Sequence, residues 1–154
     1  MPLRTVATSG EGVPALVDAL SLRGQAAQRS GERYLHHGYY RFDNNLRISA
    51  NEARATYLSH LHVNELPDAA YRAACYDSAG LGERISLLIP ARREWVFVNL
   101  YRPLRCEIDT PSAIDLLARL APLLAAATRR HLALIEAPVP TLPASLTGVS
   151  SPNS

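Results

Sequence analysis

The chain contains no lysine. All 16 of its basic residues are arginines, and they are scattered among 14 acidic residues, which gives a formal net charge of +2 at pH 7. A surface that binds nucleic acid carries its basic residues in a clustered patch or stripe, and this sequence has no such cluster. Direct contact with DNA would therefore need a module that these residues do not contain.

Cysteine is scarce as well, with only Cys75 and Cys106 in 154 residues. Neither belongs to a CxxC pair or to a Cys/His ligand spacing, which argues against a structural zinc site. The opening stretch lacks the apolar run of a secretory signal, and no uncharged segment is expected to be long enough to cross a membrane. We therefore expect a cytoplasmic protein with reduced thiols, no metal, no cofactor and no membrane partner.

Catalytic signatures are missing too. The sequence has no GxSxG nucleophile elbow, no phosphate-binding loop and no HExxH zinc motif. An enzymatic role is therefore not expected. What the chain does have is 47% hydrophobic residues and a length that suits one domain with a sizeable single core.

The amino-terminal part predicts helices after a loose start. Residues 1–12 hold Thr, Ser and two glycines and are expected to be disordered. Apolar residues recur at helical spacing over 14–27. After an interrupting Ser-Gly pair, residues 32–41 predict a second helix that becomes irregular toward its end, and the Asp-Asn-Asn run at 43–45 predicts a turn.

The central part predicts an antiparallel sheet. Residues 54–63 alternate as a strand does, and residues 68–76 predict a short helix. The β-rich runs over 85–89 and 95–101 are joined by a polar loop over 90–94, a common hairpin length. Mixed helices and antiparallel strands of this kind indicate the α+β class.

A long apolar helix follows over 113–135. Thr110 is expected to cap it and Pro111 to fill its first position. Pro122 removes one backbone hydrogen bond inside the helix, so a kink or a break into two helices is expected there. Residues 137–154 are rich in Pro and Ser and predict a linker or tail.

Four segments carry a resemblance to a known family. They are YRAACY at 71–76, RISLL at 84–88, WVFVNLYR at 95–102 and LAPLLAAATRRH at 120–131. Together they resemble the amino-terminal GAF- or PAS-like sensor domain of bacterial LuxR-type helix-turn-helix transcriptional regulators. The resemblance implies a sensor domain over 13–136, built as a GAF/PAS-like antiparallel sheet flanked by helices, with a long C-terminal helix.

The family normally continues into a carboxy-terminal helix-turn-helix domain that binds DNA. Leu146 and Thr147 stand about where that domain would begin. We therefore expect the DNA-binding half to be absent from this chain, and DNA to be reached only through a domain that the chain lacks.

Aromatic residues concentrate in the predicted hairpin and the short helix that covers it. Alternate residues of a strand point to opposite faces, so the aliphatic face with Val96 and Val98 is expected to pack on the final helix. The aromatic face would then line a ligand cavity beneath the helices over 32–41 and 68–76. The expected ligand-binding residues are Tyr57, Tyr71, Trp95, Phe97, Asn99 and Tyr101. Apolar walls with a polar Asn99 suit a small molecule, and the alternative is a fully packed core of the same residues.

For the other polar candidates, a role in binding or chemistry competes with an ordinary structural role. Arg84 and Arg102 would clamp an acidic ligand, or form ion pairs with Asp68, Asp77 or Glu83. His60 and His62 share a strand face, but no carboxylate or cysteine completes a ligand set, which favours ordinary solvated histidines. Cys75 lies toward a helix end and not its start, which favours a small buried residue over a reactive thiol.

Two functions remain. The first is a signal- or ligand-sensing and dimerisation domain of a LuxR-type regulator, in which ligand binding moves the closing helix and changes a dimer interface. The alternative is a stand-alone dimerising interaction protein that titrates full-length regulators. In both, a homodimer is expected through the helix after Thr110, because its leucines exceed what one sheet face can cover. These are Leu116, Leu117, Leu120, Leu123 and Leu124.

Overall fold

The computed structural model describes residues 3–8, 14–20, 25–51, 54–92, 94–105 and 108–135. Within them the chain forms a five-stranded antiparallel sheet with strand order β2-β1-β5-β4-β3. The strands are β1 (Leu3–Thr8), β2 (Pro14–Leu20), β3 (Tyr57–His62), β4 (Leu81–Ala91) and β5 (Glu94–Pro103).

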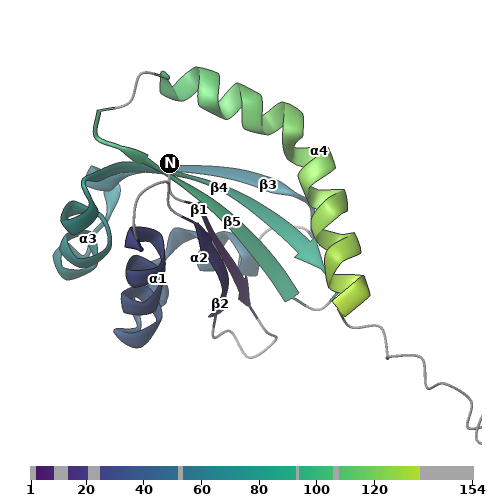
Figure 1. The fold of residues 1–154 in the computed structure, drawn as a ribbon, viewed down its shortest axis with the longest axis horizontal. Coiled ribbons are helices and arrows are strands. Elements are labelled where there is room, and N and C mark those ends of the chain that lie inside the picture. The colour runs from purple at the N-terminus through teal and green to yellow at the C-terminus, as the bar shows by residue number, and fades with distance from the viewer. Residues whose placement is uncertain are drawn as a thin grey trace, which may run out of the picture.

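Helices lie on both faces of this sheet (Figure 1). The α-helices are α1 (Ala26–His36), α2 (Asn44–Asn51), α3 (Ala69–Cys75) and α4 (Thr110–Ile135), and the 3-10 turns are η1 (Tyr39–Phe42), η2 (Val63–Glu65) and η3 (Asp77–Ala79). Helices α1, α2 and α3 gather on one side of the sheet, while α4 runs across the other (Figure 1). The α+β class, the antiparallel sheet and the long C-terminal helix predicted from the sequence are confirmed.

The predicted hairpin forms the centre of the sheet. Strands β4 and β5 pair in an antiparallel register that places Ile85 opposite Leu100 and Ile89 opposite Val96. The pairing continues to Ala91 and Glu94, so the connection is tighter than the five-residue loop expected. Arg92, at its start, has φ 44°, which lies in the left-handed region that tight hairpin turns require.

The two faces of the hairpin pack as the alternation predicts. Leu87, Ile89 and Val96 form an aliphatic cluster with Ala125 of α4. On the opposite face Leu88, Trp95 and Phe97 pack together, with Leu46 and Ile48 of α2 against them. The sheet therefore separates an aliphatic layer under α4 from an aromatic layer under the other helices. We call these the α4 face and the aromatic face.

The first two strands were not predicted. Residues 3–8 form β1 where disorder was expected, and residues 14–20 form β2 where a helix was expected. Strand β1 pairs with β5, so that Thr5 lies opposite Val98, and it pairs with β2 on its other side. A short, mostly apolar segment such as 14–20 fits a strand or a helix equally well, and here pairing with β1, which itself pairs with the distant β5, decides for the strand.

Helix α1 is longer than the pattern suggested, because it runs through Ser30 and Gly31 without interruption. Ser30 is buried, and its hydroxyl donates a hydrogen bond of 3.1 Å to the carbonyl of Cys75 in α3. That tertiary contact offsets the weak helix propensity of the Ser-Gly pair. The expected turn at 43–45 is also wrong in part, since Asn44 already begins α2.

Helix α4 starts and bends in a way that its sequence partly predicts. Asp109, not Thr110, caps it: the amide of Ser112 donates to Asp109 Oδ1 at 2.8 Å. Pro122 lies inside one continuous helix, and Figure 1 shows the ribbon changing direction about halfway along. The tail expected over 137–154, and Cys106, lie outside the described residues.

By length and composition alone, α4 would be long and apolar enough to cross a membrane. The helix carries Asp115, Arg119, Arg129 and Arg130, so it is not an uncharged segment of the kind that was not expected, and its hydropathy comes from its many alanines and leucines. In the structure α4 lies along the sheet, buries Leu117 and Ala125, and donates from Arg129 Nε to the carbonyl of Pro90 at 3.1 Å. Its apolar residues thus have a partner in the sheet on one side.

Candidate ligand-binding site

A buried ion pair stands at the centre of the aromatic face. Arg84 of β4 donates to both carboxylate oxygens of Asp43, each at 2.7 Å, and both residues are almost completely buried. Asp43 also accepts from the Tyr34 hydroxyl at 2.7 Å and from the Asn45 amide at 2.9 Å. Burial raises the pKa of Asp43, but the Arg84 charge and these hydrogen bonds outweigh it and hold the pKa below the usual value.

Tyrosine rings surround this ion pair. Tyr71 stacks on Tyr39 with ring centroids 5.4 Å apart, and it meets Tyr34 and Tyr76 at 5.9 and 5.7 Å. Tyr101 of β5 lies 5.7 Å from Tyr76. Burial, reinforced by the Asp43 carboxylate, raises the pKa of Tyr71 well above its ordinary value, so the hydroxyl stays protonated.

Several buried polar atoms near Arg84 lack a well-formed hydrogen bond among the described residues. They include the Nε atom of Arg84 and the hydroxyls of Tyr71 and Tyr76, which lie close enough to each other for a weak hydrogen bond. A buried donor without a partner costs free energy, so a cluster of them in one core is unusual. Such a cluster is a place where a polar group of a small molecule would gain hydrogen bonds.

A second polar network continues along the same face. The side-chain amide of Asn45 donates to Ser86 Oγ at 2.9 Å and to Asn99 Oδ1 at 3.2 Å, and Ser86 Oγ donates to Asn99 Oδ1 at 2.7 Å. All three side chains are buried. This network lies between the tyrosine cluster and the apolar cluster of Trp95 and Phe97, because Asn99 follows Phe97 and precedes Tyr101 at every second position of β5.

Five of the six predicted residues are buried on the aromatic face. Tyr71 and Tyr101 belong to the tyrosine cluster, Trp95 and Phe97 to the apolar cluster, and Asn99 to the polar network between them. Tyr57, at the start of β3, is 41% exposed. It stands outside this buried set, at the edge strand of the sheet.

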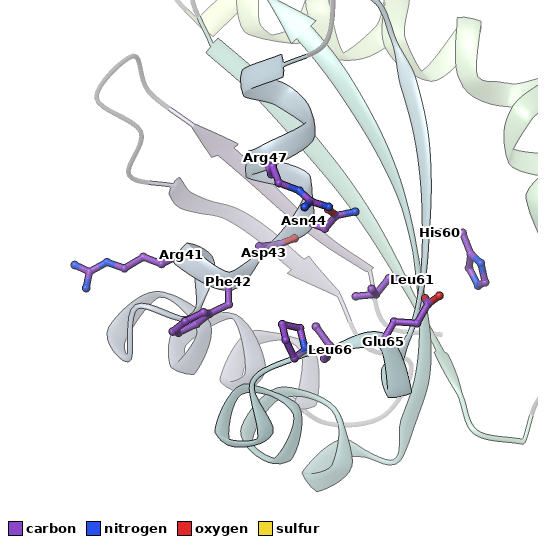
Figure 2. A pocket seen from close by; sticks show the side chains of 10 residues that line it. Arg41, Phe42, Asp43, Asn44, Arg47, His60, Leu61, Glu65 and Leu66 are labelled. Carbon is purple, nitrogen blue, oxygen red and sulfur yellow. The ribbon is translucent and has the colours of Figure 1, made fainter.

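An open groove of about 460 Å³ lies beside this buried set (Figure 2). Its lining residues are Arg41, Phe42, Asp43, Asn44, Arg47, His60, Leu61, Glu65, Leu66 and Pro67. Figure 2 shows Arg47 and Leu61 facing the space between α2 and β3, while Arg41 extends away from it. The volume suits a small molecule. Asp43 joins the groove to the polar network, since it lines the groove and binds Arg84.

Sequence reasoning missed the most connected residue of this region. Asp43 reads as the first residue of an Asp-Asn-Asn turn, and its partner Arg84 lies 41 positions away. The sequence likewise indicates only a turn position for Asn45 and an ordinary strand position for Ser86. The available signal was Arg84 itself, because an arginine in the middle of a buried strand requires a carboxylate partner.

The other sequence candidates have structural partners. Arg102 pairs with Glu83 at 3.0 Å, one of the ion pairs considered, whereas the partner of Arg84 was not among those considered. His60 Nε2 lies 3.5 Å from Glu83 Oε2. Among the described residues no group of three or more His, Cys, Asp or Glu side chains is placed to hold a metal ion. Cys75 is buried, in keeping with its structural reading.

Two solved structures share the fold of this chain. One is the N-acylhomoserine lactone dependent LuxR family transcription factor CepR2 from Burkholderia cenocepacia, with TM-score 0.56, 17% identity, and coverage of 87% of this chain and 74% of that one. The other is the VqsR LBD domain from Pseudomonas aeruginosa, with TM-score 0.52, 13% identity, and coverage of 86% and 76%. The chain has the fold of LuxR ligand-binding domains.

No protein-family model and no curated protein matches the sequence. The relation to LuxR ligand-binding domains therefore rests on the fold: a central antiparallel sheet, helices on both faces and a long C-terminal helix. At this level of identity the match shows a shared fold, and it assigns no role to individual residues of this chain.

Proposed function

We propose that this chain is a signal- or ligand-sensing and dimerisation domain of a LuxR-type bacterial transcriptional regulator, acting in the cytoplasm. The observation that carries the proposal is the buried polar network on the aromatic face, with unpartnered donors beside a groove. A buried donor without a partner lowers the stability of a packed core, and a polar group of a bound ligand would offset that cost.

The ligand would lie between the sheet and helices α2 and α3. Trp95, Phe97, Tyr71 and Tyr101 would supply apolar contacts, and Asn99 would orient a polar group. Tyr57, on the edge strand, would contact the ligand only at its exposed end. The groove beside Asp43 would be the route by which a small molecule reaches this layer.

CepR2 depends on an N-acylhomoserine lactone, which combines a polar head with an apolar chain. The aromatic face offers the same combination of surfaces, so acylated lactones are the first class to test. A thermal-shift titration with lactones of short, medium and long acyl chains should raise the melting temperature with ligand concentration. The Asn99→Ala variant should lose the shift, and Val96→Ala, on the α4 face, should keep it. A panel that leaves the wild-type melting temperature unchanged contradicts this ligand class.

Dimerisation would use the outer surface of α4. Leu117 is buried and Leu124 packs against the sheet, but Leu116, Leu120 and Leu123 are exposed. Three exposed leucines on one helix form an apolar surface that a second copy of the chain would cover. The outward position of these leucines supports the homodimer, and sedimentation at micromolar concentration tests it.

The alternative function, a stand-alone partner that titrates full-length regulators, uses the same surface. Mixing this protein with a regulator that carries a matching domain separates the two functions. A titrating partner exchanges subunits and removes the regulator from its DNA site, whereas a sensing domain remains a homodimer and responds to ligand.

A further inference from the structure

The adjacent residues Glu83 and Arg84, at one end of the central hairpin, lie on opposite faces of the sheet. On β4, Glu83 points to the α4 face and Arg84 to the aromatic face. Across the register, Glu83 lies opposite Arg102 and Arg84 lies opposite Tyr101 on β5. We call these four residues the cross-sheet cluster. On one face of the sheet the cluster contacts the start of α4, and on the other it contacts the residue before α2.

On the α4 face, the cluster holds the first residue of α4. The Thr110 hydroxyl lies 2.9 and 2.8 Å from the two carboxylate oxygens of Glu83, and Arg102 donates to Thr110 Oγ1 at 2.7 Å. Arg102 also donates to the carbonyl of Ile108 and to Glu83 at 3.0 Å. The segment that leads into α4 is therefore fastened to the sheet at this point.

On the aromatic face, the same cluster holds the start of α2. Arg84 binds Asp43 through both terminal nitrogens, and Asp43 in turn accepts from the amide of Asn45 in the first turn of α2. Asp43 also lines the groove beside β3. A molecule that enters the groove thus lies against the residue whose buried carboxylate determines where Arg84 lies.

The charges of these groups alternate in sign from one helix start to the other. Asp43 is negative, Arg84 positive, Glu83 negative and Arg102 positive, and each pairs with a neighbour of opposite sign. Three of them, Asp43, Arg84 and Arg102, are almost fully buried, where charges are screened less than at the surface. Moving or neutralising one member therefore changes the electrostatic balance of the next.

We propose that the Asp43–Arg84 pair and the Glu83–Thr110 contact are energetically coupled through β4, so that a change at the groove alters how α4 is fastened to the sheet. As a route from ligand to α4 this rests on the proposed function, but the coupling itself is a property of the protein without ligand. Coupling between two sites is reciprocal, so a change at Thr110 must be felt at Asp43 as well.

A double-mutant cycle measures the coupling. Asp43→Asn, Thr110→Val and the double variant are unfolded with denaturant. We expect the effect of the double variant on the unfolding constant to depart from the product of the single effects by more than about threefold, as for residues coupled through a shared backbone shift. Agreement with that product to within about twofold would overturn the proposal.

A matched control uses the other end of α4. Arg129 fastens that end to Pro90 and Thr56, neither of which belongs to the cross-sheet cluster. The pair Asp43→Asn and Arg129→Gln should therefore combine as independent changes. If this pair departs from independence as far as the Thr110 pair does, the effect is general loosening and the proposal fails.

Hydrogen exchange supplies a second measurement, and a milder variant protects it from misfolding. Tyr34→Phe removes one hydrogen bond to Asp43 and keeps the ion pair. In this variant the amides over 113–117 should exchange faster while those over 128–132 stay unchanged. Exchange that increases only in α1 and α2 would overturn the coupling. Because neither experiment contains a ligand, a failure here leaves the ligand titration to decide the proposed function on its own.

Discussion

Arg84 holds Asp43 by two parallel hydrogen bonds of 2.7 Å, from β4 to the residue that precedes α2. Two-pronged pairing of a guanidinium with a carboxylate fixes orientation as well as distance. It positions α2 over the sheet, and it brings the groove, the tyrosine cluster and the Asn45 network to one carboxylate. Four predictions follow from this arrangement and from the exposed surface of α4.

Removing the Asp43 charge should destabilise the protein strongly. Asp43→Asn leaves the buried Arg84 without its counter-ion, and breaking a buried pair in this way costs about 3–5 kcal/mol of unfolding free energy. Denaturant unfolding measures the loss. The matched control is Asp115→Asn, which breaks the exposed Asp115–Arg119 pair of α4 and should change the unfolding free energy by less than about 1 kcal/mol. Equal losses from both variants would contradict the prediction.

Stability should fall in acid because of the same carboxylate. The pKa of Asp43 is raised by burial but lowered further by Arg84, so it lies below the unfolded value of about 3.9. A folded-state pKa that is depressed contributes stability above the unfolded pKa and loses it as the pH falls through the folded pKa. The unfolding free energy should therefore hold near neutral pH and decline below about pH 4. Glu83, whose pKa is also lowered, contributes to the same decline. The slope should be smaller in Asp43→Asn, and an unchanged slope would count against this cause.

Two tyrosine hydroxyls of the same cluster should respond oppositely to removal. Tyr34→Phe deletes a hydroxyl that donates to Asp43 and should cost about 1–3 kcal/mol, as for a bond to a charged group. Tyr71→Phe deletes a hydroxyl that makes no hydrogen bond to a charged group in the described part of the chain and should be neutral or slightly stabilising. Thermal or denaturant unfolding of both variants gives the comparison. A Tyr71→Phe variant as unstable as Tyr34→Phe would mean that the Tyr71 hydroxyl contributes a bond of its own.

A charge on the outer surface of α4 should prevent self-association. Leu123 is 68% exposed, so Leu123→Glu should leave the unfolding of the single copy nearly unchanged, within about 0.5 kcal/mol, and shift sedimentation toward the monomer. Leu104 is equally exposed at 67% and lies outside α4, so Leu104→Glu is the matched control and should keep the association of the wild type. Association that survives Leu123→Glu would place the interface elsewhere.

The sequence predicted the elements whose signals are local. The hairpin of β4 and β5 follows from two β-rich runs, and α3 follows from Asp68, whose carboxylate accepts from the Tyr71 amide at 2.6 Å. Strand alternation predicts that Trp95 and Phe97 lie on one face of the sheet and Val96 on the other. These predictions needed no information about distant residues.

The elements that depend on distant partners were not predicted. Strand β1 exists because β5 pairs with it, and the turn-like Asp43 is placed by an arginine 41 residues away. Tyr57 was grouped with the buried aromatics, although β3 lies at the edge of the sheet and leaves its first residue exposed. Whether a strand residue is buried depends on the position of its strand in the sheet, and a short run of sequence does not show that position.

The chain has a single tryptophan, and Trp95 lies in the apolar cluster of the aromatic face, with the Arg54 guanidinium 5.8 Å from its ring centroid. Helix α4 has no tryptophan and packs on the other face. Emission from the unmodified protein therefore reports on one layer only. A compound that binds at the aromatic face should change the wavelength or intensity of the tryptophan emission. Dimerisation through α4 should leave that emission unchanged, so ligand binding and dimerisation can be distinguished in the same sample.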